Sequence, residues 1–202
     1  MYRLTPRMEQ HFRQSLATYH HLFDGNRCKG WELEELVFKA IKSDKTTNHS
    51  PKWQGAGHDD KADILVNVNG TSHQIKIKSG EIRMKRNKTT ILSLSGYRLG
   101  RFEDDLSAIS AYLNNKNVNI LSVPYRKIDG DEGRKHIYRL CYIPADFLKG
   151  ITGWEPYRKQ WRTTNNDGVL FKLTPSMSWQ IWWEIPLSII NPDKELTDGR
   201  FI

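Results

Sequence analysis

One short part of the chain carries residue types that could bind a divalent metal ion and act on a phosphate group. Asp63 precedes the apolar run Ile64–Val66, and the segment Gln74-Ile75-Lys76-Ile77-Lys78 follows after a short polar interval. Alternation along a strand would place Gln74 and both lysines on one face and both isoleucines on the other. Carboxylate and amide oxygens are hard ligands for a cation such as Mg²⁺, and a lysine ammonium stabilises negative charge on a phosphate. The pattern therefore predicts a centre that hydrolyses phosphodiesters with a metal ion.

A tight hairpin would bring these residues together. The sequence predicts one strand over Ala62–Val68 and a returning strand over Ser72–Lys78, joined at Asn69-Gly70. Asn-Gly favours a type I′ turn, because both positions tolerate a positive φ. Asp63 would then face the strand that carries the amide and the ammonium.

The remaining elements are predicted from hydrophobic spacing. Apolar residues three and four positions apart indicate helices over Thr5–Phe23, Gly30–Lys42 and Phe102–Leu113. Shorter apolar or alternating runs indicate strands over Ile91–Leu94, Val118–Ile128, His136–Ile143 and, as the last strand, Ser178–Ile185. Polar composition indicates a long loop over Ser43–Lys61 and a basic loop before the last strand, and Pro144–Leu148 is predicted to open a short helical turn. This order predicts one α/β domain over residues 1–202, with a mixed central sheet flanked by helices.

Charge and composition narrow the class of partner. The chain has 202 residues and a net charge of +8, from 31 Lys and Arg against 23 Asp and Glu. Eight basic residues and one acid lie between Lys76 and Arg101. Such a surface attracts phosphate polyanions, so nucleic acid is the expected partner.

The compartment is predicted from cysteine usage and hydrophobicity. Cys28 and Cys141 are far apart and lack CxxC spacing, so free core thiols in a reducing cytoplasm are favoured over a disulfide framework or a zinc site. No apolar run approaches the length that spans a bilayer, so no membrane partner is expected.

The order of these residues resembles the PD-(D/E)xK nuclease superfamily, whose best-known members are type II restriction endonucleases. An acid at a strand start is followed by a hairpin and then by x-Lys on the next strand. Upstream, Lys29–Val37 is similar to the superfamily's first core helix, whose glutamate approaches the metal; this implies Glu34, with Glu35 as the alternative. The resemblance covers Lys29–Lys78 and implies a restriction-endonuclease-like core.

The resemblance also implies roles for single residues. It makes Asp63, Gln74, Lys76 and Glu34 catalytic, and it assigns Mg²⁺ to the Asp63 and Gln74 oxygens, the Ile75 carbonyl and Glu34. The implied activity is cleavage of double-stranded DNA at a specific short site. Symmetric cutting then implies a homodimer, with a single subunit that acts twice as the alternative.

Two departures from the family pattern leave other functions open. Ala62 stands where the family often has Pro, which is of little consequence. Gln74 stands where the family usually has its second carboxylate, so this position supplies an oxygen but no charge. A structure-specific repair or junction nuclease, and a non-catalytic nucleic-acid-binding module with a degenerate core, therefore remain alternatives.

Two basic segments and their flanks are the predicted DNA contacts. Arg, Lys and Asn side chains can recognise base edges in the major groove, or they can contact only phosphates and fix position without sequence choice. The predicted contacts are Lys78, Arg83, Lys85, Arg86, Asn87, Lys88, Arg98, Arg101, Arg158, Lys159, Arg162, Asn165 and Asn166.

Overall fold

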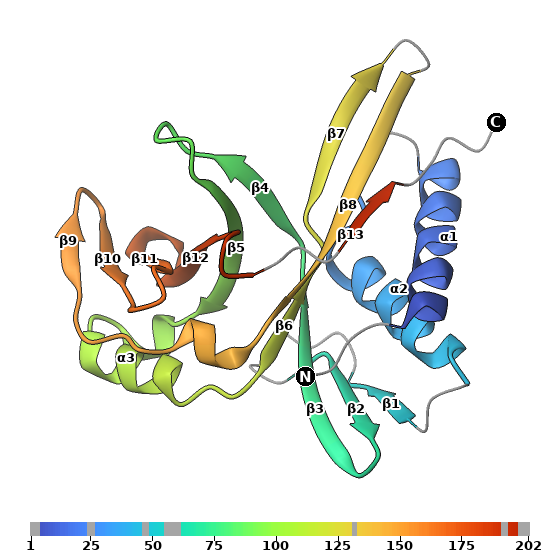
Figure 1. Ribbon diagram of the computed structural model, residues 1–202. Helices are drawn as coiled ribbons and strands as arrows, with labels where there is room; N and C mark the ends of the chain where they lie inside the picture. The colour runs from blue at the N-terminus through green and yellow to red at the C-terminus, as the bar shows by residue number, and fades with distance from the viewer. Residues whose placement is uncertain are drawn as a thin grey trace. The chain divides into compact units, whose positions relative to one another are not determined.

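The chain forms two compact units, each built from separate stretches of sequence (Figure 1). The computed structural model describes residues 5–23, 27–45, 49–54, 62–130, 133–190 and 194–197. Unit 1 comprises Met1–Ser79, Val118–Tyr142 and Pro192–Ile202, and unit 2 comprises Gly80–Asn117 and Ile143–Asn191. The α/β class is confirmed, since helices and two sheets are both present. That residues 1–202 act as a single domain stays a prediction.

Two helices of unit 1 confirm the predicted apolar stripes. Helix α1 (Pro6–Leu22) begins at Thr5, whose hydroxyl accepts a hydrogen bond from the Met8 N–H at 3.3 Å, a cap typical of helix starts. Helix α2 (Gly30–Ser43) packs against α1 (Figure 1). The buried side chains of the two helices are Met8, Phe12 and Leu16 on α1 and Leu33, Val37, Ala40 and Ile41 on α2.

The sheet of unit 1 is mixed. Its strands are β1 (His49–Trp53), β2 (Ile64–Val68), β3 (Thr71–Lys78), β6 (Asn119–Ser122), β7 (Tyr125–Gly130), β8 (Gly133–Ile143) and β13 (Lys194–Thr197). The order is β1-β2-β3-β6-β8-β13, and β7 pairs with β8. Strands β2 and β3 are antiparallel around Asn69 and Gly70, whose φ angles of 49° and 80° confirm the type I′ turn. Strand β6 runs parallel to β3.

Three predictions for this unit were wrong. The expected loop Ser43–Lys61 contains β1, an edge strand paired with β2; its segments 46–48 and 55–61 lie outside the described residues. The single strand expected over Val118–Ile128 is two strands, of which β6 pairs with β3 and β7 forms the hairpin with β8. Strand β13, which pairs with β8, follows Ser178–Ile185, the segment that was expected to be the last strand.

Unit 2 is built around a second, antiparallel sheet, so the expectation of one mixed central sheet was wrong, although the predicted strands Ile91–Leu94 and Ser178–Ile185 are confirmed within it. Its strands are β4 (Gly80–Met84), β5 (Thr90–Arg98), β9 (Glu155–Tyr157), β10 (Gln160–Thr164), β11 (Leu170–Thr174) and β12 (Gln180–Pro186). The order is β4-β5-β12-β11-β10-β9, so strands β9 to β11 occupy the segment that was expected to be a basic loop.

Helical segments of unit 2 are short. Helix α3 (Leu106–Asn114) begins four residues later than predicted, because the Asp105 carboxylate caps it by accepting from the Ala108 N–H at 2.8 Å. Three 3₁₀ turns are also present, and the second confirms the predicted helical turn: η1 (Gly100–Phe102), η2 (Ala145–Leu148) and η3 (Pro175–Met177).

Both cysteines are buried thiols outside any disulfide. Burial, with a smaller effect of the Glu32 charge, raises the pKa of Cys28 to about 12, so this thiol stays protonated at neutral pH. No helix in the described part of the chain has the length and hydrophobicity that crossing a membrane requires.

Candidate active site

The β2–β3 hairpin brings Asp63 and Lys76 together on one face of the sheet. Asp63 lies one residue before β2, where one further step of the β2–β3 register pairs it with Lys76, and its N–H donates to the Ile75 carbonyl at 3.0 Å. Asp63 therefore stands opposite Lys76, and residues opposite one another share a face. The Lys76 Nζ lies 3.5 Å from Asp63 Oδ1, and the two residues are only 7% and 6% exposed. The predicted juxtaposition of these two residues is present in the structure.

The second oxygen of Asp63 is also held. Its Oδ2 accepts from the Ile77 backbone N–H at 2.6 Å, so the carboxylate is bound by both the backbone and the side chain of β3. A buried charge is tolerated when it is paired and hydrogen-bonded, and both conditions are met here. The carboxylate consequently has one fixed orientation.

Helix α2 adds Glu34 to the same electrostatic environment. Burial and then the negative charge of Asp63 raise the pKa of Glu34 to about 7, against the opposing effect of Lys76 and Lys78. Burial and the Lys76 charge lower the pKa of Lys78. Glu34, Asp63, Lys76 and Lys78 thus form one cluster of two carboxylates and two ammonium groups, which we term the carboxylate–lysine cluster.

The other two predicted metal ligands lie on the same strand, β3. Gln74 is exposed, and alternation along β3 places it on the face that carries Lys76. The Ile75 carbonyl already accepts the Asp63 N–H, which leaves it one lone pair.

The donor set fits a hard divalent cation. Two carboxylates that lie close enough for one to raise the pKa of the other repel, and a bound cation would relieve that repulsion. Within the described residues no group of three or more His, Cys, Asp and Glu side chains could hold a metal ion. A metal at this cluster would therefore depend on the neutral oxygens of Gln74 and Ile75 beside two carboxylates.

Most predicted DNA contacts lie in unit 2, whereas Lys78 belongs to the carboxylate–lysine cluster. Exposed side chains at turns and strand ends are Arg86, Asn87, Lys88, Arg98, Arg101, Arg158, Lys159 and Asn166. Arg83 is exposed and paired with Glu81 at 2.5 Å. Lys85 and Arg162 are partly buried.

Asn165 is not available for recognition. It is 7% exposed, and its amide nitrogen donates to the Phe147 and Lys149 carbonyls at 3.0 and 2.8 Å. Its amide oxygen accepts from the Asp167 and Val169 N–H groups at 3.2 and 3.0 Å. The side chain therefore holds the β10–β11 turn in place, and it leaves the set of candidate DNA contacts.

Sequence reasoning missed Lys172 and Glu184, which form an ion pair on the sheet of unit 2. The Glu184 residue is 8% exposed although it is charged. Neither residue belongs to a recognisable motif, and only the pairing of β11 with β12 brings them together.

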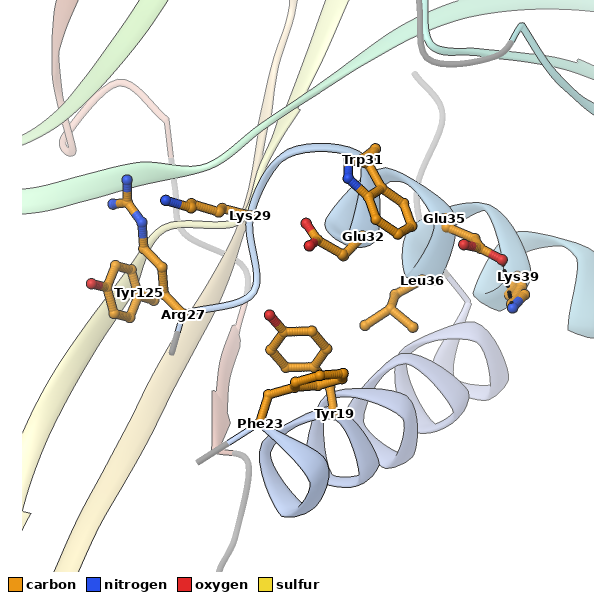
Figure 2. Close-up of a pocket in the computed structure, with 10 residues that line it drawn as sticks. All are labelled: Tyr19, Phe23, Arg27, Lys29, Trp31, Glu32, Glu35, Leu36, Lys39 and Tyr125. Atoms are coloured by element: carbon orange, nitrogen blue, oxygen red, sulfur yellow. Dashed lines mark ion pairs between the residues drawn. The ribbon is translucent and has the colours of Figure 1, made fainter. Parts of the chain in front are cut away.

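A pocket of about 760 Å³ lies on a different surface of α2. Figure 2 shows aromatic side chains from α1 and α2 around it, with charged groups at its edge. Its lining residues are Tyr19, Phe23, Arg27, Lys29, Trp31, Glu32, Glu35, Leu36, Lys39 and Tyr125. None of these belongs to the carboxylate–lysine cluster, so the pocket is a separate feature.

Comparisons of the chain with protein-family models, with curated proteins and with solved structures found no match. The proposed function therefore rests on the geometry of the carboxylate–lysine cluster.

Proposed function

We propose that the protein is a type II site-specific endonuclease that hydrolyses phosphodiester bonds of double-stranded DNA with Mg²⁺. The observation that carries the proposal is the buried Asp63–Lys76 pair at 3.5 Å, with Glu34 close enough for the Asp63 charge to raise its pKa. Solvated side chains on an exposed ribbon would not hold a carboxylate and an ammonium in this way. A preorganised arrangement of charges is what stabilises the transition state of phosphoryl transfer.

Each residue has a definite task in this proposal. Asp63, Glu34, the Gln74 oxygen and the Ile75 carbonyl would hold the magnesium ion, which when bound supplies positive charge for the phosphate oxygens. The Asp63 carboxylate is oriented by the Ile77 N–H, so its position is fixed before DNA binds. Lys76 donates from its ammonium group toward the attacking water or a phosphate oxygen and stabilises the charge that develops there.

Assembly and compartment complete the proposal. Symmetric cutting of both strands requires two active sites, so we propose a homodimer. The two buried thiols suit a reducing compartment, and we propose the cytoplasm.

A second candidate function is favoured by Gln74. Its neutral amide lowers the negative charge available to a cation, which would suit a nucleic-acid-binding module whose nuclease core no longer cleaves.

Digestion of a supercoiled plasmid separates these functions. With Mg²⁺ we expect discrete linear fragments whose ends share one short sequence when mapped by run-off sequencing, and with EDTA we expect intact plasmid. Cleavage of branched DNA irrespective of sequence would replace the proposal with a structure-specific nuclease. A plasmid that is retarded on the gel but never cut would support the nucleic-acid-binding module in place of the nuclease.

A further inference from the structure

The sheet of unit 2 has two chemically different faces. Residues opposite one another in antiparallel strands share a face, so the register assigns each side chain to one side. One face is apolar, and its largest side chains are 0 to 1% exposed: Leu92, Leu94, Phe171, Leu173, Ile181 and Trp183. Helix α3 covers this face, since Tyr112 on α3 contacts Tyr97, whose ring packs on Trp183. The other face, which we term the polar face, carries Glu184, Lys172 and Arg162 beside Trp182 and Leu170.

A buried carboxylate organises lysines on the polar face. Glu184 on β12 is 8% exposed, and Lys85 Nζ lies 2.6 Å from its Oε2. Its Oε1 pairs with Lys172 on β11. One carboxylate thus holds two ammonium groups that come from opposite sides of its strand, so the local charge stays positive.

Arginines add further positive charge beside this group. Arg162 on β10 stands opposite Lys172, and its guanidinium lies 3.6 Å from the centre of the Tyr157 ring. Its Nε is buried and has no hydrogen-bond partner among the described residues. Arg83 precedes Lys85 by two residues, so alternation puts both on the polar face, where Arg83 is paired with Glu81. We term Arg83, Lys85, Arg162 and Lys172, with Glu184 between them, the cationic cluster.

The cations are close enough to repel one another. Burial, followed by the charges of Arg162, Lys85 and Arg83, lowers the pKa of Lys172 to about 8. Grouping of like charges is unfavourable in the free protein, and an anion placed over the cluster would relieve it.

The extent of the cluster indicates a polyanion. The path from β4 to β10 crosses four strand spacings of about 4.8 Å, so the charges spread over about 19 Å. Exposed basic side chains extend this positive surface at both edge hairpins. They are Arg86 and Lys88 on the β4–β5 hairpin and Arg158 and Lys159 on the β9–β10 hairpin. A single phosphate would reach only part of this area, whereas a duplex backbone presents a continuous row of phosphates.

We propose that the polar face of the unit 2 sheet binds the phosphate backbone of double-stranded DNA through Lys85, Lys172 and Arg162, with Glu184 as the positioning residue. That the bound duplex is DNA and not RNA rests on the proposed function. The presence of the cationic cluster does not depend on that function. The contacts supply affinity and position, and base recognition is left to other residues.

The test is equilibrium binding of a fluorescent DNA duplex, measured by anisotropy in EDTA so that cleavage does not contribute. The Lys172→Gln/Arg162→Gln double variant is compared with a Lys39→Gln/Lys149→Gln control, which removes two charges from residues outside the cluster. We expect Kd to rise at least about tenfold in the cluster variant, and the slope of log K against log salt to fall by about 2, since each lost phosphate contact removes about 0.9.

Several outcomes would overturn the inference. Equal Kd values for the cluster and control variants, or an unchanged salt slope, would remove the polar face as a DNA surface. Tighter binding of an RNA duplex than of DNA would exclude DNA as the occupant. Should the double variant unfold, Lys85→Gln provides the second test, because this side chain is 38% exposed and its loss leaves the Glu184–Lys172 pair intact. Loss of binding without plasmid cleavage by the wild type would contradict only the proposed function, and cleavage with unchanged binding would contradict only this inference.

Discussion

The Glu34 carboxyl gives the most informative test of the carboxylate–lysine cluster in the absence of metal and DNA. Its pKa lies at about 7 in the folded protein, against 4.5 for an ordinary glutamate, because of burial and the Asp63 charge. Between these two pH values the folded state holds a proton that the unfolded state has released. Folding stability must therefore fall as pH rises from about 4.5 to about 7, and the loss is complete above that range.

The size of the effect follows from the same environment. A pKa rise from 4.5 to about 7 would correspond to about 3 kcal/mol for a fully buried group. Glu34 is only partly buried, so solvent screening reduces the expected cost to about 1–2 kcal/mol. The Glu34→Gln variant is neutral at every pH and close in shape to protonated Glu. It should exceed the stability of the wild type by about 1–2 kcal/mol at pH 8 and by less than about 1 kcal/mol at pH 5, where the loss has only begun.

Urea denaturation in EDTA at pH 5, 6, 7 and 8 measures this difference. The matched control is Glu35→Gln, which removes a neighbouring carboxylate that pairs with Lys39 at 2.7 Å on the helix surface. That variant should lose a few tenths of a kcal/mol and gain nothing at pH 8. A Glu34→Gln difference that is the same at pH 5 and pH 8 would refute the reasoning, because neither burial nor the Asp63 charge would then raise the pKa of Glu34.

Three further substitutions test the packing around the two sites by urea denaturation. Asp63→Ala removes the carboxylate that pairs with the buried Lys76 ammonium and should cost about 3–5 kcal/mol, most of it recovered when Lys76→Met is added. A loss under about 1 kcal/mol would contradict the contribution of the buried pair. Gly96→Ala should cost about 1–3 kcal/mol, because the new Cβ would lie 2.7 Å from the Trp183 ring. An unchanged free energy of unfolding would show that the sheet of unit 2 shifts to accommodate the methyl group. Thr5→Ala removes the cap of α1 and should cost about 1 kcal/mol; unchanged stability would mean that the cap contributes nothing.

Local sequence signals were sufficient for the β2–β3 hairpin. Asn69 and Gly70 determine the turn, and period-two alternation then fixes which residues face one another. The opposition of Asp63 and Lys76 follows from these two local rules, which is why it was predictable. The influence of Asp63 on Glu34 depends on how α2 packs against the sheet, so helix periodicity alone could not give it.

The unpredicted parts of the fold lack such signals. Strand β1 contains Pro51, which is compatible with an edge strand but reads as a loop in isolation. Strands β9 and β10 are short and carry few buried residues, so their composition resembles that of a polar loop. The pairing of β3 with β6 joins residues 44 positions apart, which no local pattern specifies. The pairing of β5 with β12 is likewise non-local, and it brings Lys85 to Glu184. Lys172 was missed because β11 was not predicted, so its place beside Glu184 on β12 could not be inferred.

The most direct test of the carboxylate–lysine cluster is the single-turnover rate of plasmid cleavage in Mg²⁺ by the wild type and by Asp63→Asn. The control is Asp146→Asn, the same chemical change at an exposed carboxylate of unit 2. With all three proteins folded, the rate should fall at least about a hundredfold for Asp63→Asn and stay unchanged for Asp146→Asn. Equal rates for the wild type and Asp63→Asn would show that the phosphodiester is cleaved elsewhere.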